Sequence, residues 1–399
     1  MNSILPSFDS ASERNFYLAF TTFIIAQFFI TYDNIWDWIF YIAVIPALIV
    51  FCYKTPFKRQ SFFTTELVIL LVTMFWLSLT LFWQDNLSFP EGLKFIKHLI
   101  FSLIFIFSCY CFFIRNSNDK NLFFWKASIS ATLVGCLISL SLYLLNSTDF
   151  STRMEPYGQL EQSILGASVY GIFGLFSLHL GLEKKNLKEK AFYFSAYAFI
   201  LVLILLTYSR APIAIFVTTS AALLFIRLPR RVVFRYVLLA FLTGILLAII
   251  PFTKTIMFDY IDALLERGLS YRLDVWGCTL KMISQKPLLG YGASSPFVCY
   301  VEGYKLAHPH NLFLGITYTS GIIGLFLFSI FSAVFTINII RKSHGQKRLF
   351  YTIIITYCFL SVLTDNPSFI TAPSPFWTFF WLPLVYVYTK TKYPEETDR

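Results

Sequence analysis

Long apolar runs, separated by short polar segments, dominate the chain. A membrane-spanning helix needs about 20 mostly apolar residues, and twelve runs have roughly that length. The runs are 16–32, 35–53, 62–83, 95–114, 122–146, 162–182, 191–207, 211–226, 232–250, 311–340, 349–364 and 373–389. The pattern predicts an all-α, polytopic membrane protein with about twelve transmembrane helices. Runs 191–207 and 211–226 are short and closely joined, so a re-entrant pair is an alternative to two crossings there.

One long segment of mixed polarity departs from this pattern. Residues 251–310 combine glycine, proline and tyrosine with aspartate, arginine and histidine, and the last three are scarce in the apolar runs. Functional side chains often occupy loops on a rigid scaffold. We therefore predict a single membrane domain over residues 1–399, with one large, partly helical loop at 251–310 in which chemistry should be sought first. The chain shows no internal repeat and no second soluble domain.

Composition excludes a soluble globular protein. Hydrophobic residues make up 57% of the chain and charged residues only 14%, with 46 Phe and 23 Tyr, which is more apolar surface than a soluble chain of this size can bury. Of the seven cysteines, five fall in or beside apolar runs, where a free thiol behaves as a small hydrophobic group. Cys278 and Cys299 share the long loop, and whether they pair is left open by the sequence.

Positive charge is distributed unequally between alternate polar segments. If the N-terminus is cytoplasmic, 22 of the 32 Lys and Arg residues lie in cytoplasmic segments, and the short outer loops hold only four. These four are Lys94, Lys97, Arg153 and Arg210. This is the positive-inside bias of membrane proteins, and it predicts that both termini are cytoplasmic and the long loop is external. The net charge of +10 therefore reflects topology and anionic lipid, and no basic groove with stacking aromatics suggests nucleic acid.

Two histidines lie where the long loop meets the run that starts near residue 311. His308 and His310 occur in Ala-His-Pro-His-Asn, in which Pro309 stiffens the chain and Asn311 is suited to cap the next helix. An imidazole titrates near neutral pH and suits general acid–base chemistry. The alternative is that the histidines only anchor the start of the helix.

Two arginines stand at the same predicted outer boundary. Arg210 lies in the tight turn between runs 191–207 and 211–226, and Arg272 lies early in the long loop. Charge at an apolar boundary is costly and suggests function, and arginine binds phosphate in a planar, bidentate manner. Together with a histidine they suggest an anionic, phosphate-bearing substrate. The alternative for Arg272 is a surface-helix residue beside Asp274.

The remaining candidates are weaker. Tyr291 lies between two glycines in a turn of the loop, and Lys94 and Lys97 start the fourth run, where they add positive charge near the site or snorkel to lipid headgroups. We assign Tyr291, Lys94, Lys97, His308 and Asn311 to substrate binding. No group of cysteines and histidines has zinc spacing, so the sequence predicts no metal site and no cofactor.

The chain resembles the O-antigen ligase family. The family motif is His-Asn, nine residues and Gly-x-x-Gly; here His310-Asn311 is followed by Leu312 to Ser320 and then by Gly321-Ile322-Ile323-Gly324. The Ser-Arg-Ala turn at Arg210, the Tyr-Arg pair at Arg272 and the Pro-Leu-Leu-Gly-Tyr-Gly run at 287–292 also fit. We expect the two motif glycines to let a neighbouring helix approach closely.

This resemblance implies a glycosyltransferase of lipopolysaccharide biosynthesis in the bacterial inner membrane. The donor would be an O-antigen polysaccharide on undecaprenyl diphosphate, and the acceptor a sugar hydroxyl of lipid A-core on the periplasmic side. Transfer would be inverting and independent of metal, with His310 as the base and Arg210 and Arg272 neutralising the diphosphate.

Two other functions compete with this interpretation. An O-antigen polymerase would use the same donor, but the superfamily's polymerases carry two sizeable arginine-rich outer loops, and residues 147–161 are short and contain only Arg153. A lipid-linked oligosaccharide transporter or flippase would place ionisable residues near the bilayer midplane, often with internal repeats. Neither feature is seen here.

Overall fold

The computed structural model describes residues 6–55, 64–85, 87–146, 152–232, 272–301, 303–365 and 368–393. Nearly all of the predicted run 232–250 and residues 251–271 of the predicted loop lie outside the described residues. The first helices are α1 (Ala11–Ala26), α2 (Asp33–Trp38), α3 (Ile45–Lys54), α4 (Thr65–Leu79), α5 (Phe89–Arg115), α6 (Asn118–Asn146), α7 (Ser163–Glu183), α8 (Leu187–Leu206) and α9 (Arg210–Arg227). They are followed by α12 (Arg272–Gln285), β1 (Cys299–Val301), β2 (Tyr304–Leu306), α13 (Leu312–Lys342), α14 (Gly345–Val362) and α15 (Leu382–Lys392).

Eight helical segments of the described chain are long and apolar enough to cross a membrane. They are Asp33–Lys54, Thr65–Trp83, Phe89–Arg115, Asn118–Asn146, Ser163–Glu183, Leu187–Leu206, Arg210–Arg227 and Leu312–Lys342. They match eight of the predicted runs, which confirms a polytopic, mostly helical membrane protein. Runs 16–32, 349–364 and 373–389 fall on α1, α14 and α15, which do not meet these length and hydropathy criteria, so the total of twelve crossings stays a prediction.

Polar residues next to the apolar runs decide where several helices begin. Ser88 and Glu91 form a reciprocal capping box at the start of α5, and Thr64 accepts a hydrogen bond from the backbone N–H of Leu67 at the start of α4. Ser10 caps α1 in the same way, so this helix begins at Ala11, five residues before the predicted apolar run. Capping supplies partners for N–H groups that the first turn leaves unpaired.

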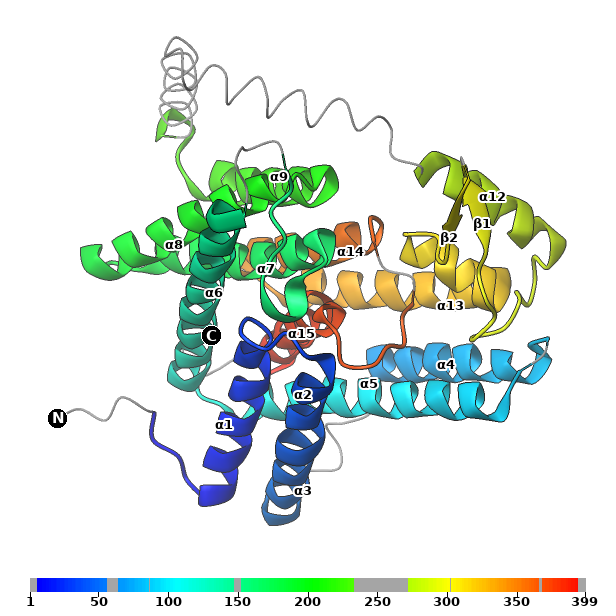
Figure 1. Cartoon of the computed structure of the whole chain (residues 1–399). Coiled ribbons are helices and arrows are strands. Elements are labelled where there is room, and N and C mark those ends of the chain that lie inside the picture. Colours follow the sequence, from blue (N-terminus) through cyan, green and yellow to red (C-terminus); the bar gives the residue numbers. More distant parts are fainter. Residues whose placement is uncertain are drawn as a thin grey trace, which may run out of the picture.

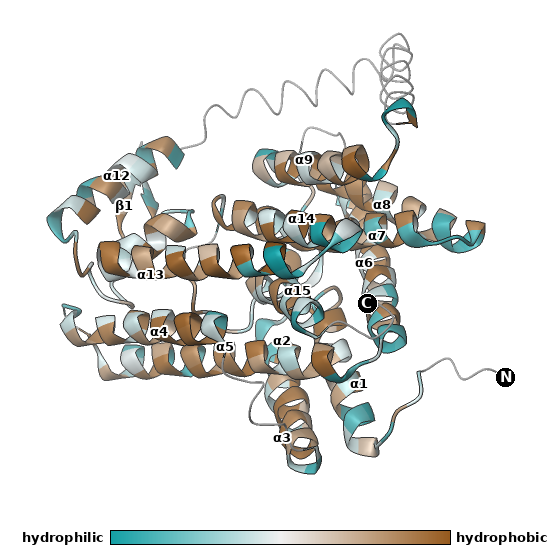
Figure 2. Cartoon of the chain, turned by 180° about the vertical axis from the view of Figure 1, so that it is seen from behind, coloured by the Kyte–Doolittle hydropathy of each residue, from teal (hydrophilic) through white to brown (hydrophobic). Residues whose placement is uncertain are grey.

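The helices form two neighbouring groups, with others crossing them (Figure 1). Helices α4, α5 and α13 run side by side, and α7, α8, α9 and α14 make up the second group. Helices α1, α3 and α6 stand upright in this view, whereas the two groups run horizontally. Apolar residues cover most of the long helices, whereas hydrophilic residues gather where α8 begins and α13 ends (Figure 2).

The antiparallel pairing of α4 with α13 defines two ends of the molecule. At one end, Glu66 of α4 accepts a hydrogen bond from Asn338 of α13 at 2.7 Å. At the other end, Trp83, which follows α4, donates a hydrogen bond to the carbonyl of Leu289, in the segment before the start of α13. We call the first end, which contains the basic residues in the last turns of α13 and α15, the basic end, and the other the histidine end.

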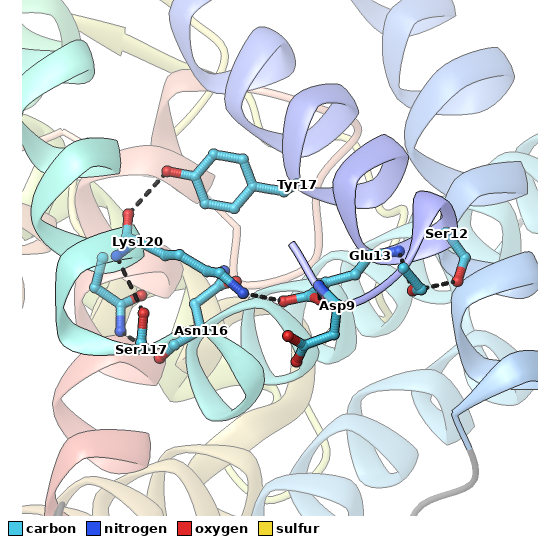
Figure 3. Close-up of polar contacts among 9 residues, drawn as sticks. Asp9, Ser12, Glu13, Tyr17, Asn116, Ser117 and Lys120 are labelled. Atoms are coloured by element: carbon cyan, nitrogen blue, oxygen red, sulfur yellow. Dashed lines mark hydrogen bonds and ion pairs between the residues drawn. The ribbon is translucent and has the colours of Figure 1, made fainter. Parts of the chain in front are cut away.

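A buried polar cluster joins α1 to the first turn of α6 at the basic end (Figure 3). Nζ of Lys120 lies 2.5 Å from Oε1 of Glu13, and the Tyr17 hydroxyl donates to the carbonyl of Lys120 at 2.8 Å. The backbone N–H of Asp9 donates to the other oxygen of Glu13. Because the Lys120 and Glu13 side chains are each only 10% exposed, each charge depends on the other for compensation.

Aromatic side chains fill the main core. Trp36 stacks on Phe23 with ring centroids 4.8 Å apart, and Trp377 stacks on Phe105 at 4.7 Å, which joins α1, α2, α5 and the π-helical turn before α15. A second, smaller core of Val275, Phe297, Cys299, Val301 and Tyr318 lies under α12. Here Cys278 and Cys299 form a disulfide, which answers the question that the sequence left open.

The described part of the predicted, partly helical loop contains strands as well as a helix. Its described part contains α12, as predicted, and also an antiparallel hairpin in which Cys299 pairs with Leu306 and Val301 with Tyr304. The all-α prediction is therefore wrong for these two strands. Each strand has only three residues, which is too short to show the alternating pattern that identifies a strand.

Helix α13 is broken at Gly321, where φ is 65° and ψ is −170°. The segment 287–292 fills the break: the Ile322 N–H donates to the carbonyl of Pro287, and the N–H of Tyr291 donates to the carbonyl of Tyr318. A Cβ at Gly321 would lie 2.0 Å from the carbonyl oxygen of Leu288. The expected helix contact at Gly321 is thus wrong, because a loop makes this close approach. Gly324 does meet a helix, since its Cβ position lies 3.4 Å from Trp76 of α4.

Candidate functional site

The site begins at the residues that lead into α13. Oδ1 of Asn311 accepts hydrogen bonds from the backbone N–H groups of Phe313 and Leu314, at 2.9 and 3.2 Å, which confirms the predicted helix cap. His310, just before it, has a φ of 51°. Residues other than glycine rarely adopt this left-handed conformation, and when they do it often marks a functional site. The cap and the unusual backbone together set the direction of the His310 ring.

Asp365 holds this ring in place. Nδ1 of His310 lies 2.7 Å from Oδ1 of Asp365, and Oδ2 of Asp365 accepts a hydrogen bond from Nε2 of Gln162, also at 2.7 Å. Asp365 follows α14 and is only 2% exposed, while Gln162 immediately precedes α7. Facing a carboxylate, Nδ1 carries the proton, so Nε2 keeps its lone pair and is able to accept one.

Sequence reasoning missed both Asp365 and Gln162. The available signal for Asp365 was its position just after an apolar run, where an acidic side chain is costly and calls for a partner. No signal identified Gln162, because a neutral amide at the start of an apolar run is ordinary.

His308 lies against His310, with ring centroids 3.8 Å apart. Nε1 of Trp276 donates a hydrogen bond to the carbonyl of Pro309 at 3.1 Å, which ties α12 to the residue between the histidines. Burial lowers the pKa of His308, the neighbouring His310 lowers it further, and Asp365 opposes both effects. His308 is therefore neutral at physiological pH and is able to accept or donate a hydrogen bond.

The two predicted arginines meet at this place from different segments. Arg210 is the first residue of α9 and Arg272 the first of α12. Burial lowers the pKa of Arg272, Asp365 opposes this, and Arg210 lowers it further, so these three charges lie close enough to interact. Arg272 also shares a face of α12 with Trp276, four residues on, which contacts Pro309. Neither arginine forms an ion pair with a carboxylate in the described part of the chain.

Arg153 supports the turn that presents Arg210. Its Nε donates to the carbonyl of Thr207 at 3.0 Å, and its Nη2 donates to the Ser209 hydroxyl at 2.7 Å. Between these two residues, Tyr208 is left-handed, with a φ of 50°. Among the described residues that are not glycine, only Tyr208 and His310 have positive φ, and both adjoin the candidate site. The sequence marked Arg153 as an isolated outer charge but gave no indication of this role.

Three predicted binding residues lie outside this group. Tyr291 stacks on Tyr318 at 4.8 Å, and its hydroxyl hydrogen-bonds to Gln285, so its contacts are those of a packing residue in the smaller core. Lys94 and Lys97 lie on the exposed side of α5, and the ammonium of Lys97 lies over the Tyr41 ring at 5.6 Å. The structure does not bring these three side chains to His310.

A cavity of about 260 Å³ opens beside His308. Its lining comes from α4, α5, the first turns of α13, the segment before β1 and residues 368–370. Phe95 of α5, which stands between Lys94 and Lys97 in the chain, forms part of this lining. The site thus consists of a histidine held by a carboxylate, two nearby arginines and an adjoining cavity.

The donor set also bears on whether a metal ion belongs here. His308, His310 and Asp365 offer three ligand atoms within 4.8 Å of one another, and these are ligand types that Zn²⁺ accepts. However, both oxygens of Asp365 already accept hydrogen bonds, and Arg210 and Arg272 add positive charge that repels a cation. The residues fit an anionic substrate better than a bound cation.

Chemically, the arrangement combines a proton acceptor with fixed positive charge. Nε2 of His310 is suited to take a proton from a hydroxyl group, and Asp365 stabilises the imidazolium that results. The arginines are suited to stabilise negative charge on a leaving phosphate. Such a site supports group transfer from a phosphate-activated donor to an alcohol.

Comparison with known proteins agrees with this chemistry. The family described as O-Antigen ligase matches residues 195–329, which include Arg210, Arg272, His308 and His310. The chain is 28% identical to the O-antigen ligase of Pseudomonas aeruginosa over 268 residues, which cover 66% of this chain and 63% of that protein. Putative polysaccharide ligases of Rickettsia felis and Rickettsia conorii are 27% and 26% identical over 202 and 201 residues, with 46% of this chain and 47% of each relative covered.

These alignments span less than two thirds of each relative's length. Asp365 and Arg153 lie outside the matched family region, so their places in the site come from the structure alone. The family match, the similarity to the Pseudomonas aeruginosa protein and the His310–Asn311 motif agree: the chain is similar to O-antigen ligases over the region that contains most of the site.

Proposed function

We propose that this protein transfers an O-antigen polysaccharide from undecaprenyl diphosphate to a sugar hydroxyl of lipid A-core. The observation that carries the proposal is the His310–Asp365 pair beside Arg210 and Arg272. A base and fixed positive charge are what an alcohol acceptor and a diphosphate leaving group require. The energy lies in the sugar–diphosphate bond, so the reaction needs no ATP.

The proposed reaction is a single displacement. Nε2 of His310 removes the proton from the acceptor hydroxyl while its oxygen attacks the anomeric carbon of the donor sugar. The bond between that carbon and the diphosphate oxygen breaks, and the configuration is inverted. Undecaprenyl diphosphate leaves with the electron pair, Arg210 and Arg272 stabilise its charge, and the proton on His310 then passes to solvent.

This mechanism needs no metal ion, because the arginines take the place of a cation at the diphosphate. Purified protein should therefore keep its transfer rate in EDTA. Loss of activity in EDTA that Mg²⁺ or Mn²⁺ restores would contradict the proposal and would assign His308, His310 and Asp365 to a metal.

We also propose that the histidine end faces the periplasm and that both termini are cytoplasmic. The positive-inside bias supports this orientation. Helix α13 also supports it, because His310 lies just before its first residue and the basic residues Arg341 and Lys342 lie at its opposite end. Reporter fusions at 184–190 and 341–348 should be cytoplasmic, and fusions at 286–305 periplasmic. The reverse result would place the site on the wrong side for lipid A-core.

The decisive test supplies purified protein with the lipid-linked polysaccharide and either of two acceptors. Transfer to lipid A-core supports a ligase, and lengthening of the lipid-linked chain without lipid A-core supports a polymerase.

Arg153 favours the ligase over the polymerase. It is the one arginine of segment 152–161, and it contacts the α8–α9 turn, so this segment is not an arginine-rich second loop. In cells, the gene should restore the O-antigen ladder of a ligase-null strain on a silver-stained gel. If the protein moves the lipid-linked donor across the membrane of a vesicle but transfers no polysaccharide to an acceptor, it is a transporter instead.

A further inference from the structure

The cavity beside His308 differs in character from the part of the site that contains the arginines. Among the described residues, its lining has no lysine, arginine, aspartate or glutamate. It is therefore poorly suited to the diphosphate, which needs positive charge or a cation. Phe95, Phe297, Tyr318 and Phe369 supply aromatic surface, and Ser295, Thr319 and Ser368 supply hydroxyl groups. Aromatic rings with a few polar groups are typical of a site for an uncharged, hydroxyl-bearing ligand.

His308 links this cavity to the proposed base. It lines the cavity, and its ring lies 3.8 Å from that of His310, centroid to centroid. Nδ1 of His308 is buried and has no hydrogen-bond partner among the described residues. A buried polar atom without a partner is costly, and a turn of the His308 ring that brings this nitrogen to a ligand hydroxyl in the cavity would relieve that cost.

The volume of the cavity also suits one sugar ring. The cavity measures about 260 Å³, just under the ~300–1,000 Å³ usual for small-molecule sites, so it is large enough for a small ligand such as one sugar ring and too small for a long chain. Only a small part of a polysaccharide or of a prenyl chain would fit in this cavity.

We propose that this cavity binds the acceptor sugar, with His308 as one of its hydrogen-bonding partners, and that no part of the lipid-linked donor occupies it. This inference rests on the proposed transfer reaction. Inversion requires the acceptor hydroxyl and the departing diphosphate to lie on opposite faces of the anomeric carbon. A cavity on the His308 side and arginines from α9 and α12 provide two chemically distinct places for these groups, with His310 next to the hydroxyl.

The test narrows the cavity and measures each substrate separately. Ala293 lines the cavity on the segment before β1, so Ala293→Phe should fill it, and Ala293→Ser is the matched control of similar size. Transfer is assayed with purified lipid A-core from a ligase-null strain as acceptor and lipid-linked polysaccharide as donor. We expect Ala293→Phe to raise the KM for lipid A-core about tenfold, which corresponds to roughly 1.4 kcal/mol, with the KM for the donor unchanged.

A second variant guards against a general folding defect. Phe95→Ala removes an aromatic wall from α5, on a different element, and it should also raise the acceptor KM while the thermal midpoint of the protein stays close to that of the unmodified chain. A rise in the donor KM, or a fall in kcat alone, in both variants would overturn the inference. If the unmodified protein fails to glycosylate lipid A-core, the proposed function itself is wrong, so the two failures are distinguishable.

Discussion

Two cavities of similar size lie along the same helices but differ in chemistry. The cavity at the basic end has a volume of about 280 Å³ and is lined by Leu70, Phe107, Phe335 and other residues of α4, α5, α13 and α15, with Glu66 as its one acidic group among the described residues. The cavity at the histidine end measures about 260 Å³ and contains His308. Both use α4, α5 and α13, so the helices alone do not decide what a cavity binds. The segments that cover the histidine end supply its polar groups.

Charge follows the same division. At the basic end, the buried Glu13 and Glu66 each face a lysine, Lys120 at 2.5 Å and Lys342 at 3.6 Å. At the histidine end, Asp365 faces a histidine, and Arg210 and Arg272 have no ion pair with a described carboxylate. Internal neutralisation at one end stabilises the fold, whereas the excess positive charge at the other leaves a place for an anion.

The largest effect should come from His310. Replacing it with alanine removes the proposed base, which typically costs about 10²–10⁴-fold in rate, enough to empty the O-antigen ladder. His308→Ala should be milder and should act mainly on the acceptor KM. Both variants are assayed at matched membrane levels with lipid-linked donor and lipid A-core. If His308→Ala is inactive while His310→Ala remains active, His308 is the base. If both variants remain active, neither histidine acts as the catalytic base.

The arginines should come next. Arg272→Ala and Arg210→Ala each remove a stabiliser of the leaving group, and the loss of one such donor costs about 10²–10³-fold in kcat. Lysine replacements should recover only part of the activity, because a point charge does not copy the planar guanidinium. The control is Lys342→Ala at the basic end, which should leave the transfer rate unchanged. Near-normal transfer by Arg272→Ala would return this residue to a surface role.

Asp365→Asn tests how the histidine is held. The amide keeps the shape of the side chain but loses the charge that orients and stabilises the His310 ring, so kcat should fall, because an amide partner disturbs the tautomer of a catalytic histidine. The KM values for both substrates should change little, which separates positioning from binding. Gln162→Glu, which places a second carboxylate beside Asp365, is a companion variant that should also slow transfer. Full activity in Asp365→Asn would show that His310 works without this partner.

The smallest effect on chemistry should come from the ion pair at the basic end. Lys120→Met leaves Glu13 buried without its partner, and breaking a buried pair costs about 3–5 kcal/mol of stability. The thermal midpoint should fall, while the KM values and kcat of the folded fraction should not change. Adding Glu13→Gln should recover much of the midpoint. A specific loss of kcat in Lys120→Met would mean that the two ends are coupled.

Much of the helical framework was predictable because an apolar run of about 20 residues has few alternatives in a bilayer. The same reasoning failed where contacts between distant segments decide the structure. Gly321 reads as a helix-packing residue, yet the segment 287–292 occupies its place and breaks α13. The hairpin of β1 and β2 was not predicted, because a strand of three residues is too short to show the alternation of apolar and polar residues that identifies a strand.

The candidate site divides in the same way. Arg210, Arg272 and His310 stood out because each is a polar residue at an apolar boundary or in a recognisable motif. Asp365 and Gln162 did not, because their importance lies in contacts across the fold: Asp365, after α14, holds His310 across 55 residues, and Gln162, before α7, holds Asp365. Tyr291 was assigned to the substrate from its glycine neighbours, whereas its ring packs on Tyr318. Partners that meet only after folding are not visible in a linear pattern.

The disulfide between Cys278 and Cys299 has a consequence for how the protein matures. Such bonds form and persist in oxidising compartments such as the bacterial periplasm, so under the proposed orientation it closes only after this segment has been exported. It ties α12, whose first residue is Arg272, to β1. The membrane helices can thus be inserted before the site is complete, and under the proposed function Arg272 becomes fixed only after it has reached the side on which it would meet the donor.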